Sequence, residues 1–159
     1  MADRPLRVLS IVGTRPEAIK MAPVITRLRD QGDRVCAMVC VTGQHRQIAD
    51  QMLDYFGVGA DFDLDLMEEE QSLCGLVAGL VDGLGEIVDR TRPDWVLAQG
   101  DTASVLAAGM VSYFQRVRFG HVEAGLRTGD RNNPFPEEVN RRYADMVADL
   151  LFAPTGRAR

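Results

Sequence analysis

Short apolar runs that alternate with longer amphipathic segments are the feature of this sequence that most constrains its fold. Each run is bounded by glycine, proline or polar residues, which is typical of strands buried on both faces of a sheet. The runs are Leu6–Val12, Val35–Val41, Trp95–Gln99, Val117–Val122 and Leu150–Ala153.

Segments with helical spacing of apolar residues lie between these runs. Pro16 suits the start of the first helix, and Pro23 predicts a kink unless the regular part of that helix begins only near Lys20. Further helices are expected over about 44–56 and 103–113, and again after Pro136. The acidic stretch 61–70 predicts a loop with one short extended piece.

The strongest amphipathic pattern is expected to start after Ser72 as the N-cap and to run to about Arg90. Glycine recurs every four residues on this helix, at Gly75, Gly79 and Gly83. Acidic residues interrupt the segment, which excludes a membrane GxxxG pair. We therefore expect these glycines to pack the helix closely on a sheet.

Alternation of strands and helices predicts an α/β fold, a doubly wound parallel sheet of the Rossmann-like type with helices on both faces. No internal repeat, low-complexity segment or linker interrupts the pattern. The length of 159 residues suits one domain, which we expect to span 1–159.

Composition argues against several functional classes. A formal net charge of −5 disfavours a nucleic-acid partner. The first residues do not read as a signal peptide, and no apolar run reaches the ~18 residues of a membrane span, so we expect a cytoplasmic protein without a membrane partner. The number of cysteines is odd and their spacing is not paired; they are Cys36, Cys40 and Cys74. We interpret them as buried free thiols rather than as a metal site.

Polar residues that break the helical and strand patterns follow the ends of four predicted strands. They lie in the strings Gly13–Lys20, Thr42–Arg46, Gln99–Thr102 and His121–Arg127. Because ligands bind beyond the carboxyl ends of parallel strands, these strings predict an active-site edge.

Each of these residues also has a simpler structural explanation. Asp101 could cap the following helix, and Arg15 and Lys20 could be solvated surface charges. Glu137 could merely favour the helix dipole in a first turn. Glu123 is harder to explain in this way, because a carboxylate between Val122 and Ala124 is expected to be partly buried.

The nucleotide-binding patterns that can be tested in the sequence are absent. Neither G-x-G-x-x-G after the first strand nor a P-loop sequence is present, which argues against a dinucleotide dehydrogenase and a P-loop NTPase. Several carboxylates at one sheet edge suit proton transfer better than phosphoryl transfer. We expect neither a cofactor nor a metal.

Five ordered strings resemble the motif set of the bacterial non-hydrolysing UDP-N-acetylglucosamine (UDP-GlcNAc) 2-epimerases. They are Gly13-Thr14-Arg15-Pro16-Glu17-Ala18-Ile19-Lys20-Met21-Ala22-Pro23, Thr42-Gly43-Gln44-His45-Arg46, Gly100-Asp101-Thr102, His121-Val122-Glu123-Ala124-Gly125-Leu126-Arg127-Thr128-Gly129-Asp130 and Pro134-Phe135-Pro136-Glu137-Glu138-Val139-Asn140-Arg141. The resemblance extends over essentially the whole chain. The resemblance implies one half of a GT-B-like enzyme that eliminates UDP from UDP-GlcNAc and re-adds it to give UDP-ManNAc.

The resemblance also implies roles for individual residues. Asp101, Glu123 and Glu137 match the family's catalytic carboxylates, and Arg15 and Lys20 match its catalytic-site cations. Arg15, Lys20 and Arg127 are the expected substrate-binding cations. Gln44, His45 and Gln47 resemble the region that helps to hold a second UDP-GlcNAc as an allosteric activator.

The family continues beyond the segment that matches Pro154-Thr155 into a second, nucleotide-gripping domain, which this chain lacks. The chain is therefore expected to be inactive alone. Two other functions stay open: a non-catalytic binding or interaction module, and another GT-B-like enzyme such as a hydrolysing epimerase or a glycosyltransferase. Whether the chain forms a homodimer is also left open.

Overall fold

A computed structural model describes residues 4–43, 55–66 and 71–159. Its centre is one parallel sheet with the strand order β3-β2-β1-β4-β5-β6. The strands are β1 (Leu6–Val12), β2 (Val35–Val41), β3 (Phe62–Asp63), β4 (Trp95–Gln99), β5 (Arg118–Val122) and β6 (Leu150–Phe152). The predicted doubly wound α/β fold is confirmed, and the expected strands end within one residue of the observed ones.

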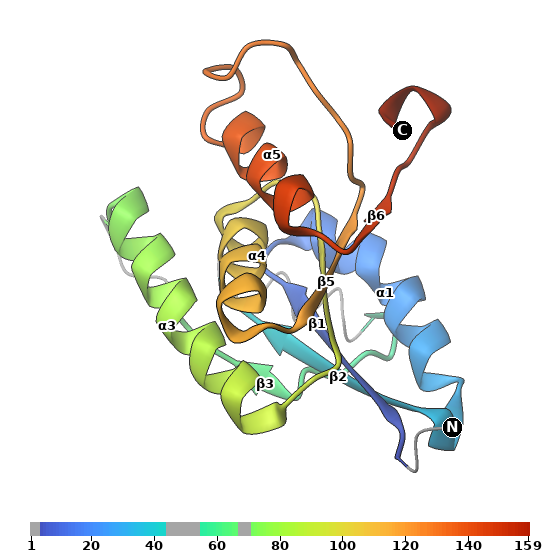
Figure 1. Ribbon diagram of the computed structural model, residues 1–159. Helices are drawn as coiled ribbons and strands as arrows, with labels where there is room; N and C mark the ends of the chain where they lie inside the picture. The colour runs from blue at the N-terminus through green and yellow to red at the C-terminus, as the bar shows by residue number, and fades with distance from the viewer. Residues whose placement is uncertain (1–3, 44–54, 67–70) are drawn as a thin grey trace.

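Helices cover both faces of this sheet, as predicted. In Figure 1, α1 lies on one side of the strands, and α3 and α4 lie on the other. The helices are α1 (Arg15–Arg29), α3 (Leu73–Thr91), α4 (Ala103–Gln115) and α5 (Glu137–Val147), with short 3-10 turns at Gly32–Arg34 and Gly156–Ala158. Among the described residues, no helix is long and apolar enough to cross a membrane.

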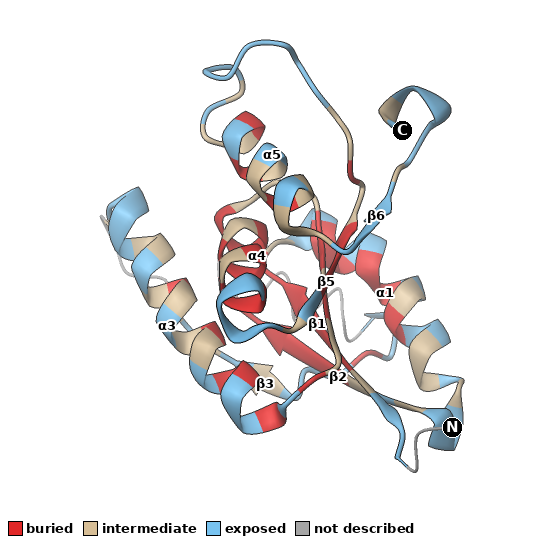
Figure 2. Cartoon of the chain, viewed as in Figure 1, coloured by how far each residue is buried: buried red, intermediate tan, exposed pale blue. Residues whose placement is uncertain are grey.

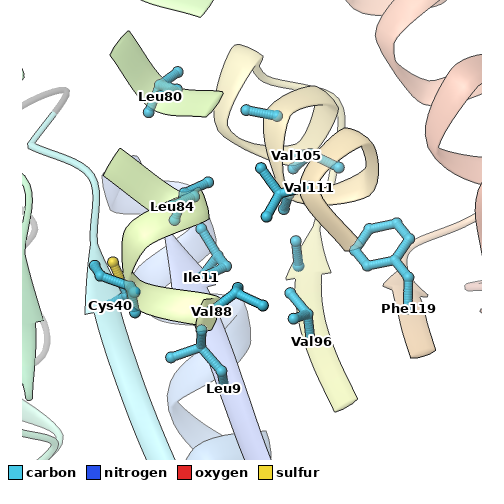
Figure 3. Close-up of a cluster of buried hydrophobic side chains, with 14 of the residues drawn as sticks. Leu9, Ile11, Cys40, Leu80, Leu84, Val88, Val96, Val105, Val111 and Phe119 are labelled. Atoms are coloured by element: carbon cyan, nitrogen blue, oxygen red, sulfur yellow. The ribbon is translucent and has the colours of Figure 1, made fainter. Parts of the chain in front are cut away.

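Two apolar cores hold these layers together, one on each face. The larger core packs Leu9, Ile11 and Phe119 of the sheet against α3 and α4, including Leu84 and Val105 (Figure 3). The smaller core packs the other sheet face against α1. Figure 2 shows the result, with the central strands largely buried between helices whose outer sides are exposed, and β6 exposed.

Pro23 does not delay or end the first helix. α1 is continuous from Arg15 to Arg29 with Pro23 inside it, so the alternative of a regular part that begins only near Lys20 is wrong. Met21, Ala22 and Ile25 are fully buried on the same helix. Their packing outweighs the backbone hydrogen bond that proline removes.

Gly79 and Gly83 of α3 pack on a neighbouring loop segment instead of on the sheet, whereas Gly75 lies beside the N-cap Ser72. A Cβ on Gly83 would lie 3.0 Å from Leu64 Cδ2, and one on Gly79 would lie 3.8 Å from Leu66 Cδ2. The predicted N-cap is confirmed, because the Ser72 hydroxyl accepts a hydrogen bond from the Gly75 N–H at 3.1 Å.

Only one of the cysteines is buried. Cys40 lies in the core, and burial raises the pKa of its thiol to about 12. Cys36 and Cys74 are exposed, so the prediction of buried thiols is wrong for these two. Cys36 belongs to the first residues of β2, which the helices leave uncovered.

Candidate active site

A pocket of about 310 Å³ opens at the carboxyl ends of β1, β4 and β5. The strand order reverses between β1 and β4, and ligands of open α/β sheets bind at such a reversal. The pocket is lined by Thr14, Pro16, Glu17, Lys20, Gln99, Gly100, Asp101, Thr102, Glu123 and Leu126. The structure thus brings Lys20, Asp101 and Glu123 together, as the sequence predicted.

Glu123 is bound by two side chains from neighbouring elements. Lys20 on α1 donates to both carboxylate oxygens, at 2.9 Å and 2.7 Å, and the Gln99 side-chain amide also donates to this carboxylate. The Glu123 side chain is 26% exposed, as expected for a partly buried acid. A lysine beside a half-buried carboxylate gives the pocket both a proton acceptor and a cation.

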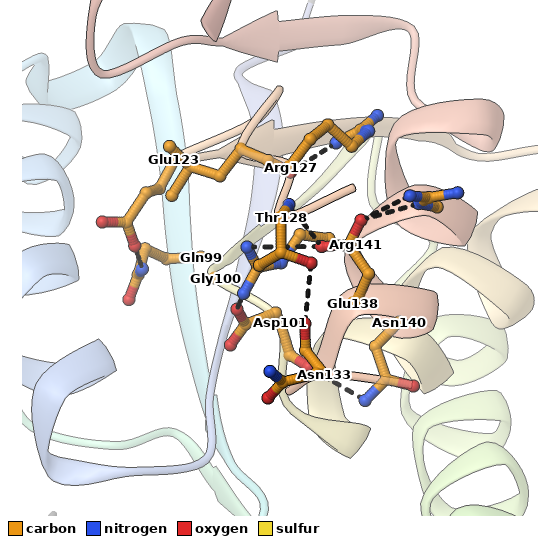
Figure 4. Close-up of polar contacts among 12 residues, drawn as sticks. Gln99, Gly100, Asp101, Glu123, Arg127, Thr128, Asn133, Glu138, Asn140 and Arg141 are labelled. Atoms are coloured by element: carbon orange, nitrogen blue, oxygen red, sulfur yellow. Dashed lines mark hydrogen bonds and ion pairs between the residues drawn. The ribbon is translucent and has the colours of Figure 1, made fainter. Parts of the chain in front are cut away.

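Asp101 is positioned by the start of α5 instead of serving as a helix cap. The N-cap of α4 is Thr102, whereas the Asp101 carboxylate pairs with Arg141 (Figure 4). The Asn140 side chain donates to the Asp101 carbonyl oxygen at 2.9 Å. The interpretation of Asp101 as a simple cap is therefore wrong.

Glu17 is a third acid in the pocket that the sequence reasoning did not select. Its carboxylate accepts hydrogen bonds from the backbone of Gly13 and Thr14 and, at 2.7 Å, from the Thr102 hydroxyl. It is almost fully buried, and this burial raises the pKa of its carboxyl group despite those donors. The Thr-x-x-Glu spacing of Thr14 and Glu17, a capping-box pattern, was the signal that could have identified it.

Other predicted site residues lie outside this pocket. Arg15 is exposed at the start of α1, and the half-buried Glu137 is the first residue of α5; neither is among the lining residues. Arg127 pairs with Asp145 at 2.7 Å and lines an adjacent pocket of about 430 Å³ that also contains Arg157. Gln44, His45 and Gln47 lie outside the described residues.

The loop that follows β5 is held by buried acids on α5. Glu138, next to the predicted Glu137, is completely buried and accepts from the Thr128 N–H at 3.2 Å and the Arg142 side chain at 2.8 Å. Asp145 binds His121, and neither residue had been assigned a role from the sequence. Within the described part of the chain, no group of three or more His, Cys, Asp or Glu side chains is arranged to hold a metal ion.

Comparison with known proteins identifies the family to which this site belongs. A family model described as UDP-N-acetylglucosamine 2-epimerase matches residues 26–159. The chain belongs to the UDP-N-acetylglucosamine 2-epimerase family. The expected family resemblance is thereby confirmed.

Individual epimerases match nearly the whole chain. A putative UDP-N-acetylglucosamine 2-epimerase of Thermotoga maritima is 49% identical over 154 residues, which are 97% of this chain and 40% of that protein. The UDP-N-acetylglucosamine 2-epimerase of Bacillus subtilis is 45% identical over 156 residues, which are 98% of this chain and 41% of that protein.

A solved epimerase structure has the same fold. The crystal structure of UDP-GlcNAc 2-epimerase from Neisseria meningitidis bound to UDP-GlcNAc superposes with a TM-score of 0.92 at 42% identity, over 96% of this chain and 41% of that one. The chain therefore spans about 40% of the length of these epimerases.

Proposed function

We propose that this chain forms the carboxylate-bearing wall of a UDP-GlcNAc 2-epimerase active site, which interconverts UDP-GlcNAc and UDP-ManNAc. The observation that carries the proposal is that Asp101 and Glu123, at the ends of adjacent strands, line one pocket together with Lys20. The N. meningitidis relative binds UDP-GlcNAc, which supports the same substrate here.

The proposed reaction needs a proton acceptor and a stabilised leaving group. A carboxylate removes the C2 proton of the sugar while the C1–O bond breaks and its electron pair leaves with UDP. UDP then re-adds to C1 while a proton is delivered to the opposite face of C2. Because the C2 proton is only weakly acidic, the acceptor must be held close to it. Asp101, Glu123 and Glu137 are the proposed proton-transfer groups, with Arg15 and Lys20 as cations and Arg127 as a further substrate contact.

The remainder of the active site is proposed to lie on a second domain. A volume of about 310 Å³ is at the lower end of the ~300–1,000 Å³ typical of ligand pockets, which suits a sugar better than a complete nucleotide sugar. The chain matches about 40% of each relative, and residues 1–159 would form the first of two Rossmann-like domains. Gln44, His45 and Gln47 stay proposed allosteric contacts.

Partners and location complete the proposal. An apolar groove along α3, lined by residues such as Val77 and Val81 together with Met110 of α4, supports a homodimer that sedimentation velocity would detect. The exposed free thiols of Cys36 and Cys74 suit a reducing compartment, which supports a cytoplasmic location.

A chimera tests the function directly. In it, this chain replaces the segment that it matches in the B. subtilis enzyme, and proton NMR follows conversion of UDP-GlcNAc. Asp101→Asn, Glu123→Gln and Glu137→Gln should each lower kcat ~10²–10⁴-fold, the usual contribution of proton transfer, while UDP affinity changes little. Near-normal turnover in one variant would remove that residue from the catalytic set.

The second candidate is a non-catalytic binding module, favoured by the 40% coverage of the relatives. It predicts UDP-GlcNAc binding by the chain without turnover in the chimera. Release of free ManNAc would instead indicate a hydrolysing enzyme.

A further inference from the structure

The turn that carries Glu123 has an unusual backbone. Glu123 has φ of +67°, a left-handed conformation that side chains other than glycine seldom adopt. Gly125 follows with φ of +83°, and a Cβ there would lie 1.8 Å from the Ala158 carbonyl oxygen. Such a conformation at a candidate catalytic acid persists only where neighbouring groups hold it.

Each backbone N–H of this turn has an acceptor. The Glu123 and Ala124 N–H groups both donate to the Phe152 carbonyl oxygen of β6, at 3.0 Å and 3.1 Å. The Gly125 N–H donates to the Asp145 carboxylate on α5 at 3.0 Å. Asp145 is therefore the side chain that fixes the far end of the Glu123 turn.

Asp145 also reaches the turn that carries Asp101, through His121. His121 is completely buried, with Nδ1 2.5 Å from an Asp145 oxygen and Nε2 2.7 Å from the Gly100 carbonyl oxygen. A carbonyl oxygen only accepts, so Nε2 donates to Gly100, and the other ring nitrogen, Nδ1, makes the hydrogen bond to Asp145. The Gly100 N–H in turn donates to the Val122 carbonyl oxygen at 3.0 Å.

We propose that Asp145 and His121 are positioning residues that clamp the two strand-end turns carrying Asp101 and Glu123 at the separation the reaction needs. The proposal rests on the proposed epimerase function. Neither Asp145 nor His121 is among the residues that line the pocket. Their effect on Asp101 and Glu123 passes through Gly100 and Gly125, while Asp145 separately pairs with the proposed substrate contact Arg127.

Asp145→Asn tests the clamp, because three donors face this carboxylate: His121, Gly125 and Arg127. An asparagine offers one acceptor oxygen, so at least one donor loses its acceptor. Asp149→Asn is the matched control. The Asp149 carboxylate also accepts a hydrogen bond from a backbone N–H of β5, that of Phe119 at 2.8 Å. The single oxygen of an asparagine can keep this hydrogen bond, and Phe119 lies at the opposite end of β5 from Glu123.

In the 159-residue chain, we expect Asp145→Asn to speed hydrogen exchange at the Glu123 and Gly125 amides at least ~10-fold, while Asp149→Asn leaves them unchanged. In the chimera, Asp145→Asn should lower kcat by about 10²-fold, the cost of a small misplacement, with the UDP Kd within about threefold. A purely structural role would instead lower kcat and raise the UDP Kd together.

Unchanged exchange at Glu123 and Gly125 in Asp145→Asn would overturn the clamp. So would wild-type kcat in the chimera variant. If Asp145→Asn does not fold, hydrogen exchange of the His121 Nε2–H in the wild-type chain decides: protection of this proton supports the clamp, and exchange at the rate of an exposed imidazole overturns it. Failure of the epimerase proposal would appear separately, as an inactive wild-type chimera.

Discussion

At the scale of single residues, Glu17 makes the stability of the chain depend on pH. Burial raises the pKa of the Glu17 carboxyl group in the folded chain above the value of about 4.3 in the unfolded chain. The protonated Glu17 side chain therefore contributes its full share of the stability below about pH 4.3, and this contribution is lost as the pH rises through the folded-state pKa. Glu17→Gln removes this loss, because its amide oxygen can accept from Gly13 and Thr14 while its NH₂ group donates to Thr102. We expect the Tm of the variant to match the wild type near pH 4 and to exceed it increasingly towards pH 8.

Glu86→Gln on the exposed side of α3 is the control for this measurement, and its Tm should follow the wild type across the same range. Thermal unfolding by circular dichroism at several pH values gives both curves. A Glu17→Gln variant less stable than the wild type at pH 8 would show that the hydrogen bonds of the carboxylate outweigh its burial.

At the scale of elements, Gly79 and Gly83 of α3 have different surroundings. An alanine Cβ at Gly79 meets only ordinary contacts at 3.8 Å, so Gly79→Ala should stabilise the chain by about 0.5–1 kcal/mol through the lower entropy of the unfolded chain. At Gly83 the added Cβ lies 3.0 Å and 3.2 Å from the two Leu64 methyl groups, which must move. Gly83→Ala should therefore stabilise the chain less than Gly79→Ala does, or destabilise it. Urea denaturation compares the two, and a Gly83→Ala variant at least as stable as Gly79→Ala would contradict the packing described for Leu64.

At the scale of the whole molecule, we expect the chain to fold alone and to show little or no epimerase activity. Cores on both faces of the sheet support independent folding. Elimination of UDP requires a held diphosphate and a site shielded from water. Asp101, Glu123 and Lys20 line a pocket of only about 310 Å³, which is small for a complete nucleotide sugar. Proton NMR of UDP-GlcNAc incubated with the purified chain, beside the active chimera, measures this. Turnover comparable to that of the chimera would show that one wall suffices.

The sequence by itself determined the elements, the fold class and the edge of the sheet that carries the chemistry. Short apolar runs and helical spacing are local patterns, and the ends of parallel strands meet at one edge whatever the details of packing. Asp101, Glu123 and Lys20 could therefore be expected at one site. The long ordered motifs supplied the family, which composition and spacing could not.

Only the tertiary structure decided which side chains hold those residues. Arg141 on α5 reaches Asp101 across 40 positions of sequence, and Asp145 reaches His121 across 24. No local pattern encodes such contacts, because they depend on where α5 packs against α4 and β5. The continuity of α1 through Pro23 and the exposure of Cys36 have the same origin, since packing overrides propensity and the helices cover only part of each strand.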